Sequence, residues 1–390
     1  MIMNIIVAIQ VAILLYFAYA VLIQLVLAIA SQWTTKNFPA GQGRKTFAIF
    51  IPAYKEDKVI EQTVQSALNQ QYAPERYRVI VIADNLKKST LANLSKYPIQ
   101  IIQYASPERT KTKAIRKALG TLPNGAFDIA LVLDADNQLA PHFLQEIEAV
   151  FEQGFKAVQG LRTAANLDTP MAVLDGAAEV INHRMYGKGA LNVGQSARLM
   201  GSGMAFDLEL FRELIMQSQA VGGFDKELEM ELAQRKEPIF FAEKAIVFDE
   251  KVRSQAVYKK QRRRWISAQL FYFRKYWKAA LLELTLKGKV GFFFKWTLLA
   301  VLPRIILPFA LSLVSIFYWL LSGWTWLSIS MLGLLVIHLA TLLYLLPKSY
   351  YTGPNRKAWI NLFSVIWCTL GILGRLKGAN RTFIHTPHGK

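Results

Sequence analysis

An uncharged apolar stretch near the N-terminus constrains the fold of this chain more than any other feature. Residues 5–30 carry no charged side chain, and Gln10 and Gln24 are their only strongly polar ones. A helix needs about 20 apolar residues to cross the hydrocarbon core of a bilayer, and this stretch exceeds that length. A cleavable signal peptide would have a basic n-region and a shorter apolar core. Because neither is present, the sequence predicts a retained transmembrane anchor over residues 1–31.

Two more apolar stretches lie towards the C-terminus. Residues 305–321 and 324–346 are joined by a short turn at Gly323, so we predict a transmembrane hairpin over 305–346. The preceding segment, 266–304, mixes basic and aromatic side chains, which is typical of helices at a membrane surface. We expect this segment to form interfacial helices.

The distribution of basic residues sets the expected topology. If the polar block 45–265 is cytoplasmic, a fourth span at 358–373 would place the basic C-terminal tail outside, against the positive-inside rule. We therefore predict that residues 358–390 form an interfacial helix and a basic cytoplasmic tail. The chain is expected to be a multi-pass protein of the cell membrane, with membrane lipids as partners and its polar block in the cytoplasm.

The formal net charge of +19 invites a nucleic-acid interpretation, but the placement of the charge argues against it. Ten Lys or Arg residues and no acid lie between Lys251 and Lys278, and four more lie between Gly374 and Lys390. Both runs flank apolar segments, where cytoplasmic loops of membrane proteins collect positive charge. We expect no nucleic-acid partner. The single cysteine, Cys368, excludes an internal disulfide framework.

The polar block alternates between short apolar runs and helical patterns. The predicted strands are Phe47–Ile51, Val79–Ala83, Ile99–Tyr104 and Ile129–Leu133, and the predicted helices are Lys58–Asn69, Lys113–Leu119 and Pro141–Phe151. Such alternation predicts an α/β domain with a mainly parallel sheet covered by helices. Ligands of these sheets bind beyond the carboxyl ends of the strands.

Acidic residues follow three of the predicted strands. Glu56 comes after the first strand, Asp84 after the second, and Asp134 and Asp136 after the fourth. Each has an ordinary explanation, because Asp and Asn are common turn formers. At successive strand ends, however, they would line one crevice. Two carboxylates two residues apart suit a hard divalent cation that neutralises a diphosphate.

Three further motifs follow in the second half of the polar block. Gly201-Ser202-Gly203 permits close backbone approach to a ligand. The acids of residues 225–231 are typical of the first turns of a helix, where the helix dipole also stabilises carboxylates. The last motif combines two side chains that can donate hydrogen bonds to a diphosphate, Gln261 and Arg264, with the aromatic face of Trp265. A basic run before an apolar segment is, however, more often a membrane-surface anchor.

This ordered set of motifs resembles the family-2 inverting glycosyltransferases, most of all the membrane-integrated branch that includes cellulose and hyaluronan synthases. The set comprises Pro-Ala-Tyr-x-Glu, Ala-Asp-Asn, Asp-Ala-Asp, Gly-Ser-Gly, an acidic cluster and Gln-x-x-Arg-Trp, and it covers about residues 45–270. The resemblance implies a GT-A domain with a Rossmann-like, mainly parallel sheet and α-helical transmembrane segments. It also implies a nucleotide-diphosphate sugar as donor, Mg²⁺ or Mn²⁺ as cofactor, and a growing polysaccharide as acceptor.

The resemblance assigns roles to individual residues. The donor would contact Pro52, Glu56, Asp84, Lys113, Asp134, Gln261 and Arg264, and Asp136 would bind the metal. The acceptor, a glycan or glycolipid, would contact Gly201, Ser202, Gly203 and Trp265. The family motif Glu-Asp-x-Glu-Leu is replaced here by Leu228-Glu229-Met230-Glu231-Leu232. Alignment through its end gives Glu229 as the catalytic base, one methylene longer than the usual Asp.

Two alternatives to this assignment remain open from the sequence alone. The enzyme could add a single sugar to a membrane lipid instead of extending a polysaccharide. Alternatively, the chain could be a catalytically silent subunit of glycan assembly that kept the fold. Its intact Asp-x-Asp and Gln-x-x-Arg-Trp motifs argue against the silent subunit, because such a copy need not keep both. A smaller departure is Lys55, which stands where the family usually has Asn.

Overall fold

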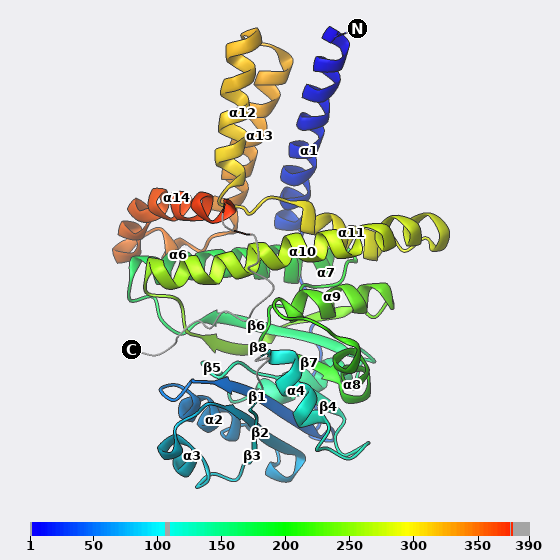
Figure 1. Ribbon diagram of the computed structural model, residues 1–390, viewed down its shortest axis with the longest axis vertical. Coiled ribbons are helices and arrows are strands. Elements are labelled where there is room, and N and C mark those ends of the chain that lie inside the picture. The colour runs from blue at the N-terminus through cyan, green and yellow to red at the C-terminus, as the bar shows by residue number, and fades with distance from the viewer. Residues whose placement is uncertain (1, 106–109, 375, 377–390) are drawn as a thin grey trace.

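The computed structural model describes residues 2–105, 110–374 and 376 (Figure 1). A sheet with covering helices forms one end of the molecule, and three helices stand side by side at the other end. Between these two parts, helices α6 (Pro170–Asn182), α10 (Gln255–Lys287), α11 (Val290–Ala300) and α14 (Leu362–Leu373) lie crosswise.

The first half of the sheet is parallel, as the sequence predicts. Strands β1 (Phe47–Tyr54), β2 (Tyr77–Asp84), β3 (Gln100–Gln103) and β4 (Ile129–Val132) lie in the order β3-β2-β1-β4. Helices α2 (Ile60–Leu68), α3 (Lys88–Leu94), α4 (Lys111–Leu119) and α5 (Phe143–Phe151) connect or cover these strands. All four strands of the prediction are present.

Alternation along β1 explains why both faces of the sheet are covered. Phe50 packs into one apolar cluster together with Ile115 of α4, whereas Ile49 packs into a second cluster together with Val64 of α2. Successive side chains of a strand point to opposite faces, so a strand that is apolar at every position must be buried on both sides. This is the physical basis of the continuous apolar runs in the sequence.

The second half of the sheet is mixed and was not predicted. Strands β5 (Asn137–Leu139), β6 (Ala157–Ala164), β7 (Met204–Asp207) and β8 (Ile239–Asp249) complete the order β3-β2-β1-β4-β7-β6-β8-β5. Strand β7 pairs antiparallel with both β4 and β6, whereas β6 and β8 are parallel. Helices α8 (Leu208–Gln217) and α9 (Phe224–Gln234) follow β7. The eight strands therefore form one Rossmann-like, mainly parallel sheet.

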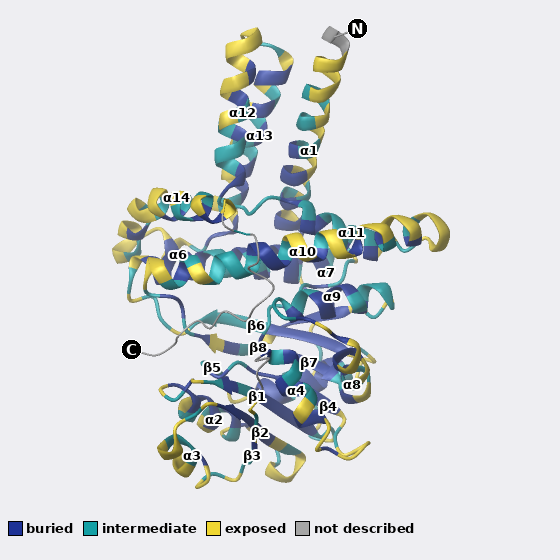
Figure 2. Ribbon diagram, in the orientation of Figure 1, coloured by how far each residue is buried: buried dark blue, intermediate teal, exposed yellow. Residues whose placement is uncertain are grey.

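The three upright helices are α1 (Ile2–Ala30), α12 (Leu307–Ser322) and α13 (Trp326–Leu345). Within the described residues, two helical segments, Ile5–Ala30 and Trp326–Leu345, are long and apolar enough to cross a bilayer. Helix α12 has 16 residues, about 24 Å at 1.5 Å per residue, which is shorter than the roughly 30 Å hydrocarbon core. Its exposed side is nevertheless apolar, as are the exposed sides of α1 and α13 (Figure 2).

Two expected segment boundaries fall inside continuous elements. Helix α10 runs without interruption through residue 265, so the end of the polar block and the start of the 266–304 segment share one helix. At the other end, Gly353–Asn361 is a 3₁₀-helix that leads into α14, and the expected interfacial helix becomes regular at Leu362. Residues 377–390 of the expected basic tail lie outside the described residues.

Candidate active site

The carboxyl ends of β1 and β2 meet at one edge of the sheet. In their parallel register Tyr54 lies beside Asp84, and the Lys55 amide donates to the Asp84 carbonyl over 3.1 Å. Glu56 and Asp84 are both buried there. Lys55 has φ of 56°, the left-handed region in which Asn is more easily accommodated than Lys. This backbone conformation agrees with the Asn that the family resemblance leads us to expect at the position.

Asp134 follows β4 at the same edge of the sheet. Its backbone amide donates to Ser202 Oγ over 2.9 Å, and its carboxylate forms an ion pair with Lys111. Burial by itself would raise the pKa of Asp134, but the charge and hydrogen bond of Lys111, together with the charges of Arg162 and Arg264, hold this pKa below its usual value. Asp134 is therefore ionised at neutral pH.

Lys111, and not Lys113, is the lysine seen in contact with this aspartate. Thr110 caps α4 by accepting from the Lys113 amide, so Lys111 occupies the first position of the helix. The Lys111 ammonium donates to Asp134 and to the Gly201 carbonyl, the latter over 2.7 Å. It also lies 4.9 Å from the ring centre of Phe224. The family resemblance singled out Lys113, which lies two positions further along the same helix.

The Gly201-Ser202-Gly203 turn supports the loop that holds Asp134. Ser202 is fully buried, and its carbonyl accepts from Gln159 Nε2 over 2.9 Å. Gly203 has φ of 63°, and a Cβ there would lie 2.6 Å from Val247 Cγ2, so no other residue fits. The turn that is predicted to contact the acceptor therefore also positions the loop after β4, through the hydrogen bond from the Asp134 amide to Ser202 Oγ.

Asp136 lies beside Asp249, which sequence reasoning missed. Asn137 Nδ2 donates to Asp249 Oδ1 over 2.7 Å and reaches Asp136 Oδ1 at 3.4 Å. Burial raises the pKa of Asp249 to about 6; Arg162 opposes this rise, and the charge of Asp136 adds to it. Asp249 ends β8, an element that the sequence analysis did not identify, so its approach to Asp136 required the β5–β8 pairing.

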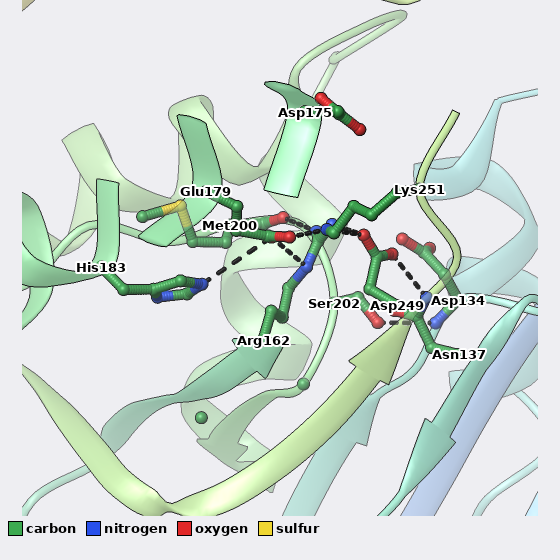
Figure 3. Close-up of polar contacts among 12 residues, drawn as sticks. Asp134, Asn137, Arg162, Asp175, Glu179, His183, Met200, Ser202, Asp249 and Lys251 are labelled. Atoms are coloured by element: carbon green, nitrogen blue, oxygen red, sulfur yellow. Dashed lines mark hydrogen bonds and ion pairs between the residues drawn. The ribbon is translucent and has the colours of Figure 1, made fainter. Parts of the chain in front are cut away.

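Arg162 on β6 organises a buried ionic network that includes Asp249 (Figure 3). Its guanidinium contacts Asp249 Oδ2 at 2.8 Å and Glu179 Oε1 at 2.9 Å. Lys251 pairs with the same two acids, and burial lowers the pKa of Lys251 to about 7. The network joins the aspartates to α6, which carries Glu179 and leads into the π-helix η2 (His183–Gly189).

Helix α10 delivers Arg264 to the aspartates. Burial lowers the pKa of Arg264, while the charges of Asp134, Asp225 and Asp136 act on it in the opposite direction. One residue on, Trp265 is partly buried, and the Arg262 guanidinium lies 4.3 Å from its ring centre. Gln261 Oε1 is buried without a hydrogen-bond partner among the described residues.

The acidic side chains of α9 have different surroundings. Asp225 is the one whose charge acts on Arg264. Glu227 pairs with Lys275 and with the Ser218 hydroxyl, and Glu231 accepts from the Tyr276 hydroxyl over 2.6 Å. Glu229, the base expected from alignment, is buried and pairs with Lys295 of α11 at 2.8 Å. It also accepts from the Leu199 amide over 3.3 Å.

A family model matches the sequence that forms this site. The sequence model described as "Glycosyltransferase like family 2" matches residues 44–268, more than half of the chain. The chain belongs to glycosyltransferase family 2. No curated protein sequence matches this glycosyltransferase in a sequence search. Its assignment as a transferase that uses a nucleotide sugar therefore rests on the family match and on the fold.

A solved mannosyltransferase structure shares the fold of this glycosyltransferase, and two further structures are similar at lower scores. A mannosyltransferase from Pyrobaculum calidifontis, in complex with GDP-mannose and Mn²⁺, has a TM-score of 0.59 at 15% identity, over 93% of this chain and 97% of that one. S. aureus TarS has a TM-score of 0.41 at 13% identity, over 68% and 52% of the two chains. Glucosyl-3-phosphoglycerate synthase from Mycobacterium tuberculosis, with Mn²⁺, UDP and phosphoglyceric acid, scores 0.39 at 15% identity, over 56% and 78%.

The glycosyltransferase site has donor atoms that suit a divalent metal. Asn137 Nδ2 contacts the carboxylates of both Asp136 and Asp249, and Asn137 Oδ1 is buried without a hydrogen-bond partner in the described ranges. Hard cations such as Mg²⁺ and Mn²⁺ prefer such oxygen ligands. The described residues contain no cluster of three or more acidic, His or Cys side chains arranged as a metal site.

Proposed function

We propose that this glycosyltransferase catalyses a metal-dependent, inverting transfer of a hexosyl group from a nucleotide diphosphate at a membrane surface. The observation that carries the proposal is the convergence of charges on Arg264. This one cation on α10 interacts with Asp134 and Asp136 after β4 and with Asp225 on α9. Acids from two different parts of the chain thus surround a diphosphate-binding donor.

The proposed reaction is a single in-line displacement. A hydroxyl oxygen of the acceptor bonds to the anomeric carbon of the donor sugar, and the bond from that carbon to the diphosphate breaks. The acceptor proton passes to a carboxylate, and Arg264 and Lys111 stabilise the negative charge that develops on the leaving diphosphate. Attack opposite the leaving group inverts the anomeric configuration.

The metal would be held by Asp136 and Asp249. When bound, Mg²⁺ or Mn²⁺ would neutralise charge on the diphosphate as a Lewis acid. The Mn²⁺ in the complex of the Pyrobaculum mannosyltransferase supports this choice of metal. Arg162 would fix the orientation of Asp249, because its guanidinium contacts Asp249 Oδ2. The same contact partly compensates the negative charge of Asp249.

We propose Asp225, and not Glu229, as the catalytic base. Asp225 lies within the charge field of Arg264 and retains 19% side-chain exposure, so an acceptor hydroxyl can reach it. Glu229 is more deeply buried and its ion pair with Lys295 is short at 2.8 Å, whereas Asp225 lies 3.8 Å from Lys226 and is partly exposed. The acidic motif is therefore interpreted as Gly-Phe-Asp at residues 223–225.

A lipid-linked acceptor fits the upright helices better than a translocated polysaccharide. The facing side chains of α1, α12 and α13 form one apolar cluster that includes Phe17, Leu311 and Met331. A cluster of this kind fills the space between the helices with apolar side chains. The product would then stay on the face of the membrane where it is made.

The remaining donor and topology assignments are carried over as proposals. Pro52, Glu56 and Asp84 at the ends of β1 and β2 would contact the nucleoside, and Lys113 and Gln261 would lie at the edge of the donor. The domain and the C-terminus would face the cytoplasm, with α1, α12 and α13 in the membrane and α10, α11 and α14 at its surface. Exposed apolar side chains on these surface helices, such as Trp277 and Trp367, support that placement.

The test is donor hydrolysis and sugar transfer by the purified protein in lipid nanodiscs. A panel of nucleotide sugars would be assayed with Mg²⁺, with Mn²⁺ and with a chelator. The expected result is release of nucleoside diphosphate from one donor class, abolished by the chelator. If no donor is hydrolysed under any of these conditions, or if the chelator has no effect, the proposed activity is wrong.

A further inference from the structure

Arg304 lies in the link between α11 and α12, and this link runs at the base of the upright helices (Figure 1). Its Nη2 donates to the Ala178 carbonyl over 3.0 Å and to Asn182 Oδ1 over 2.8 Å. Its Nη1 is buried and has no hydrogen-bond partner among the described residues. Half of the guanidinium therefore donates to the end of α6, and the other half is unsatisfied.

The charge of Arg304 is also uncompensated. Within the described ranges no carboxylate pairs with it, and the charged neighbours that lower its pKa are two further cations, Arg198 and Arg262. Burial is the larger cause and, together with these cations, lowers the pKa of Arg304 to about 10. A buried polar nitrogen without a partner is rare in native proteins, and a buried cation without a counter-charge is costly. Both deficits would be removed by one bound anion.

Arg198 offers a second free donor edge at this place. Its guanidinium carbon lies 3.8 Å from the ring centre of Tyr186, and no ion pair to Arg198 is present in the described part of the chain. A guanidinium stacked on a ring keeps its in-plane N–H groups available for an oxyanion. Tyr186 belongs to η2, and π-helical turns occur frequently at functional sites.

This basic pair adjoins the active site on one side and apolar side chains on the other. Arg262, whose charge acts on Arg304, pairs with Asp175 and stands two residues before Arg264 on α10. Tyr186 also belongs to an apolar cluster with the buried Leu27 of α1 and Leu345 of α13, and the same helix ends carry exposed apolar side chains such as Ile29 and Leu343. A ligand at Arg304 could therefore reach the active site and also extend along apolar surface.

We propose that Arg304 and Arg198 bind the phosphate of a lipid-linked acceptor, whose hydrocarbon chain lies along the bases of α1 and α13. The inference rests on the proposed function and deepens it by naming the acceptor as a phosphate-linked glycolipid. The phosphate anchors the lipid, and the nucleophile remains a hydroxyl of the sugar that the lipid carries. Arginine suits this task because its planar fork donates two hydrogen bonds to one phosphate.

The test measures binding of farnesyl phosphate to the full-length protein in a neutral detergent, without donor. Farnesol and inorganic phosphate are titrated in parallel, because they separate the lipid chain from the charge. Farnesyl phosphate should bind, and both comparison ligands should bind at least about tenfold more weakly. The Arg304→Gln variant should lose about tenfold or more in affinity for farnesyl phosphate, and Arg304→Lys should lose less. Arg198→Gln should weaken binding in the same direction.

The matched control is Arg356→Gln, which removes an exposed positive charge from the 3₁₀-helix before α14. It should leave the affinity for farnesyl phosphate unchanged. Titration with GDP and UDP, together with the unfolding temperature, shows that each variant is folded and still binds nucleotide. Equal binding of farnesol or of inorganic phosphate would overturn the proposal, as would unchanged affinity in Arg304→Gln.

The two proposals fail separately. If a nucleotide sugar is hydrolysed but farnesyl phosphate does not bind, the phosphate site is wrong and the transferase assignment stands. If farnesyl phosphate binds through Arg304 while no donor is hydrolysed, the site is correct and the proposed activity fails.

Discussion

Lys295 of α11 holds Glu229 of α9 in a buried ion pair, with Nζ 2.8 Å from Oε1. Less than a tenth of either side chain is exposed to solvent, and Lys295 also donates to the Ala197 carbonyl over 2.6 Å. Removing one partner of such a pair leaves an uncompensated buried charge, which typically costs about 3–5 kcal/mol. The pair therefore fixes α11 against the catalytic domain, and Glu229 has a structural task.

We predict that Asp225→Asn lowers transfer by about a hundred-fold or more, because it removes the proton acceptor. Nucleotide binding should change little. Glu229→Gln, the matched variant on the same helix, should instead lower the unfolding temperature, and Glu229→Gln combined with Lys295→Met should recover part of that loss. Steady-state transfer and thermal unfolding distinguish the two effects. Loss of transfer in a fully stable Glu229→Gln protein would restore the assignment made from sequence alignment.

We predict that Asp136→Asn abolishes transfer while the protein still folds and inserts, because the variant loses the charge that holds the metal. Isothermal titration with Mn²⁺ in the presence of nucleoside diphosphate should show weaker metal binding than in the unchanged protein. Asp168→Asn, which removes an acid paired with Arg253 at the surface, is the control and should keep full activity. Normal transfer by the Asp136 variant would exclude the metal role.

We predict that Lys111→Met raises the apparent KM for the donor far more than Lys113→Met does. Lys111 pairs with Asp134 and donates to the Gly201 carbonyl, so its loss leaves Asp134 without its nearest counter-charge. Loss of a charge-assisted hydrogen bond costs about 1.5–3 kcal/mol, or roughly ten-fold to a hundred-fold in affinity. Donor titrations of the two variants decide the matter. An equal or larger effect at Lys113 would favour the lysine chosen from sequence.

We predict that Trp265→Ala impairs acceptor use more than donor binding. Arg262 lies over the Trp265 ring and Trp265 directly follows Arg264, so the ring stands beside the proposed diphosphate site. Aromatic faces suit stacking on sugar rings. Donor hydrolysis in the absence of acceptor should be nearly normal while transfer falls. Weaker nucleotide binding combined with normal use of the acceptor would reverse the assignment.

We predict that His183 contributes to acid sensitivity. Burial lowers its pKa to about 3 from the ordinary 6.5, and the nearby charge of Arg162 lowers it further. Glu179 lies 3.7 Å from His183 Nε2, but it is already paired with Arg162 and Lys251, so it cannot reverse the effect. The folded state thus keeps His183 neutral, whereas the unfolded chain takes up a proton below about pH 6.5.

The sign follows from proton uptake by the unfolded state. Its greater uptake lowers stability as the pH falls from about 6.5 towards about 3. Relative to His183→Gln, the unchanged protein should lose about 2 kcal/mol of unfolding free energy between about pH 7 and about pH 5. Thermal unfolding of both proteins across this range is the measurement. Parallel pH profiles would show that His183 does not titrate on unfolding.

Sequence by itself determined the parallel half of the sheet and the residues at its carboxyl edge. Apolar runs such as Phe47–Ile51 predict buried strands because a strand covered on both faces must be apolar at every position. Parallel connection then brings Glu56, Asp84 and Asp134 to one edge whatever their loops do. The family resemblance followed from the order of these motifs along the chain, and that order can be read directly from the sequence.

Tertiary structure decided the contacts between segments far apart in the chain. Asp249 lies near Asp136 because β5 pairs with β8. Glu229 forms its ion pair with Lys295 because α11 packs on α9. Alignment selected Glu229 from the acids of one helix without information on their surroundings. Their surroundings separate them, because burial beside a cation fixes one charge while partial exposure near Arg264 leaves the other available. Burial and partner choice depend on packing between distant segments, and no local pattern encodes them.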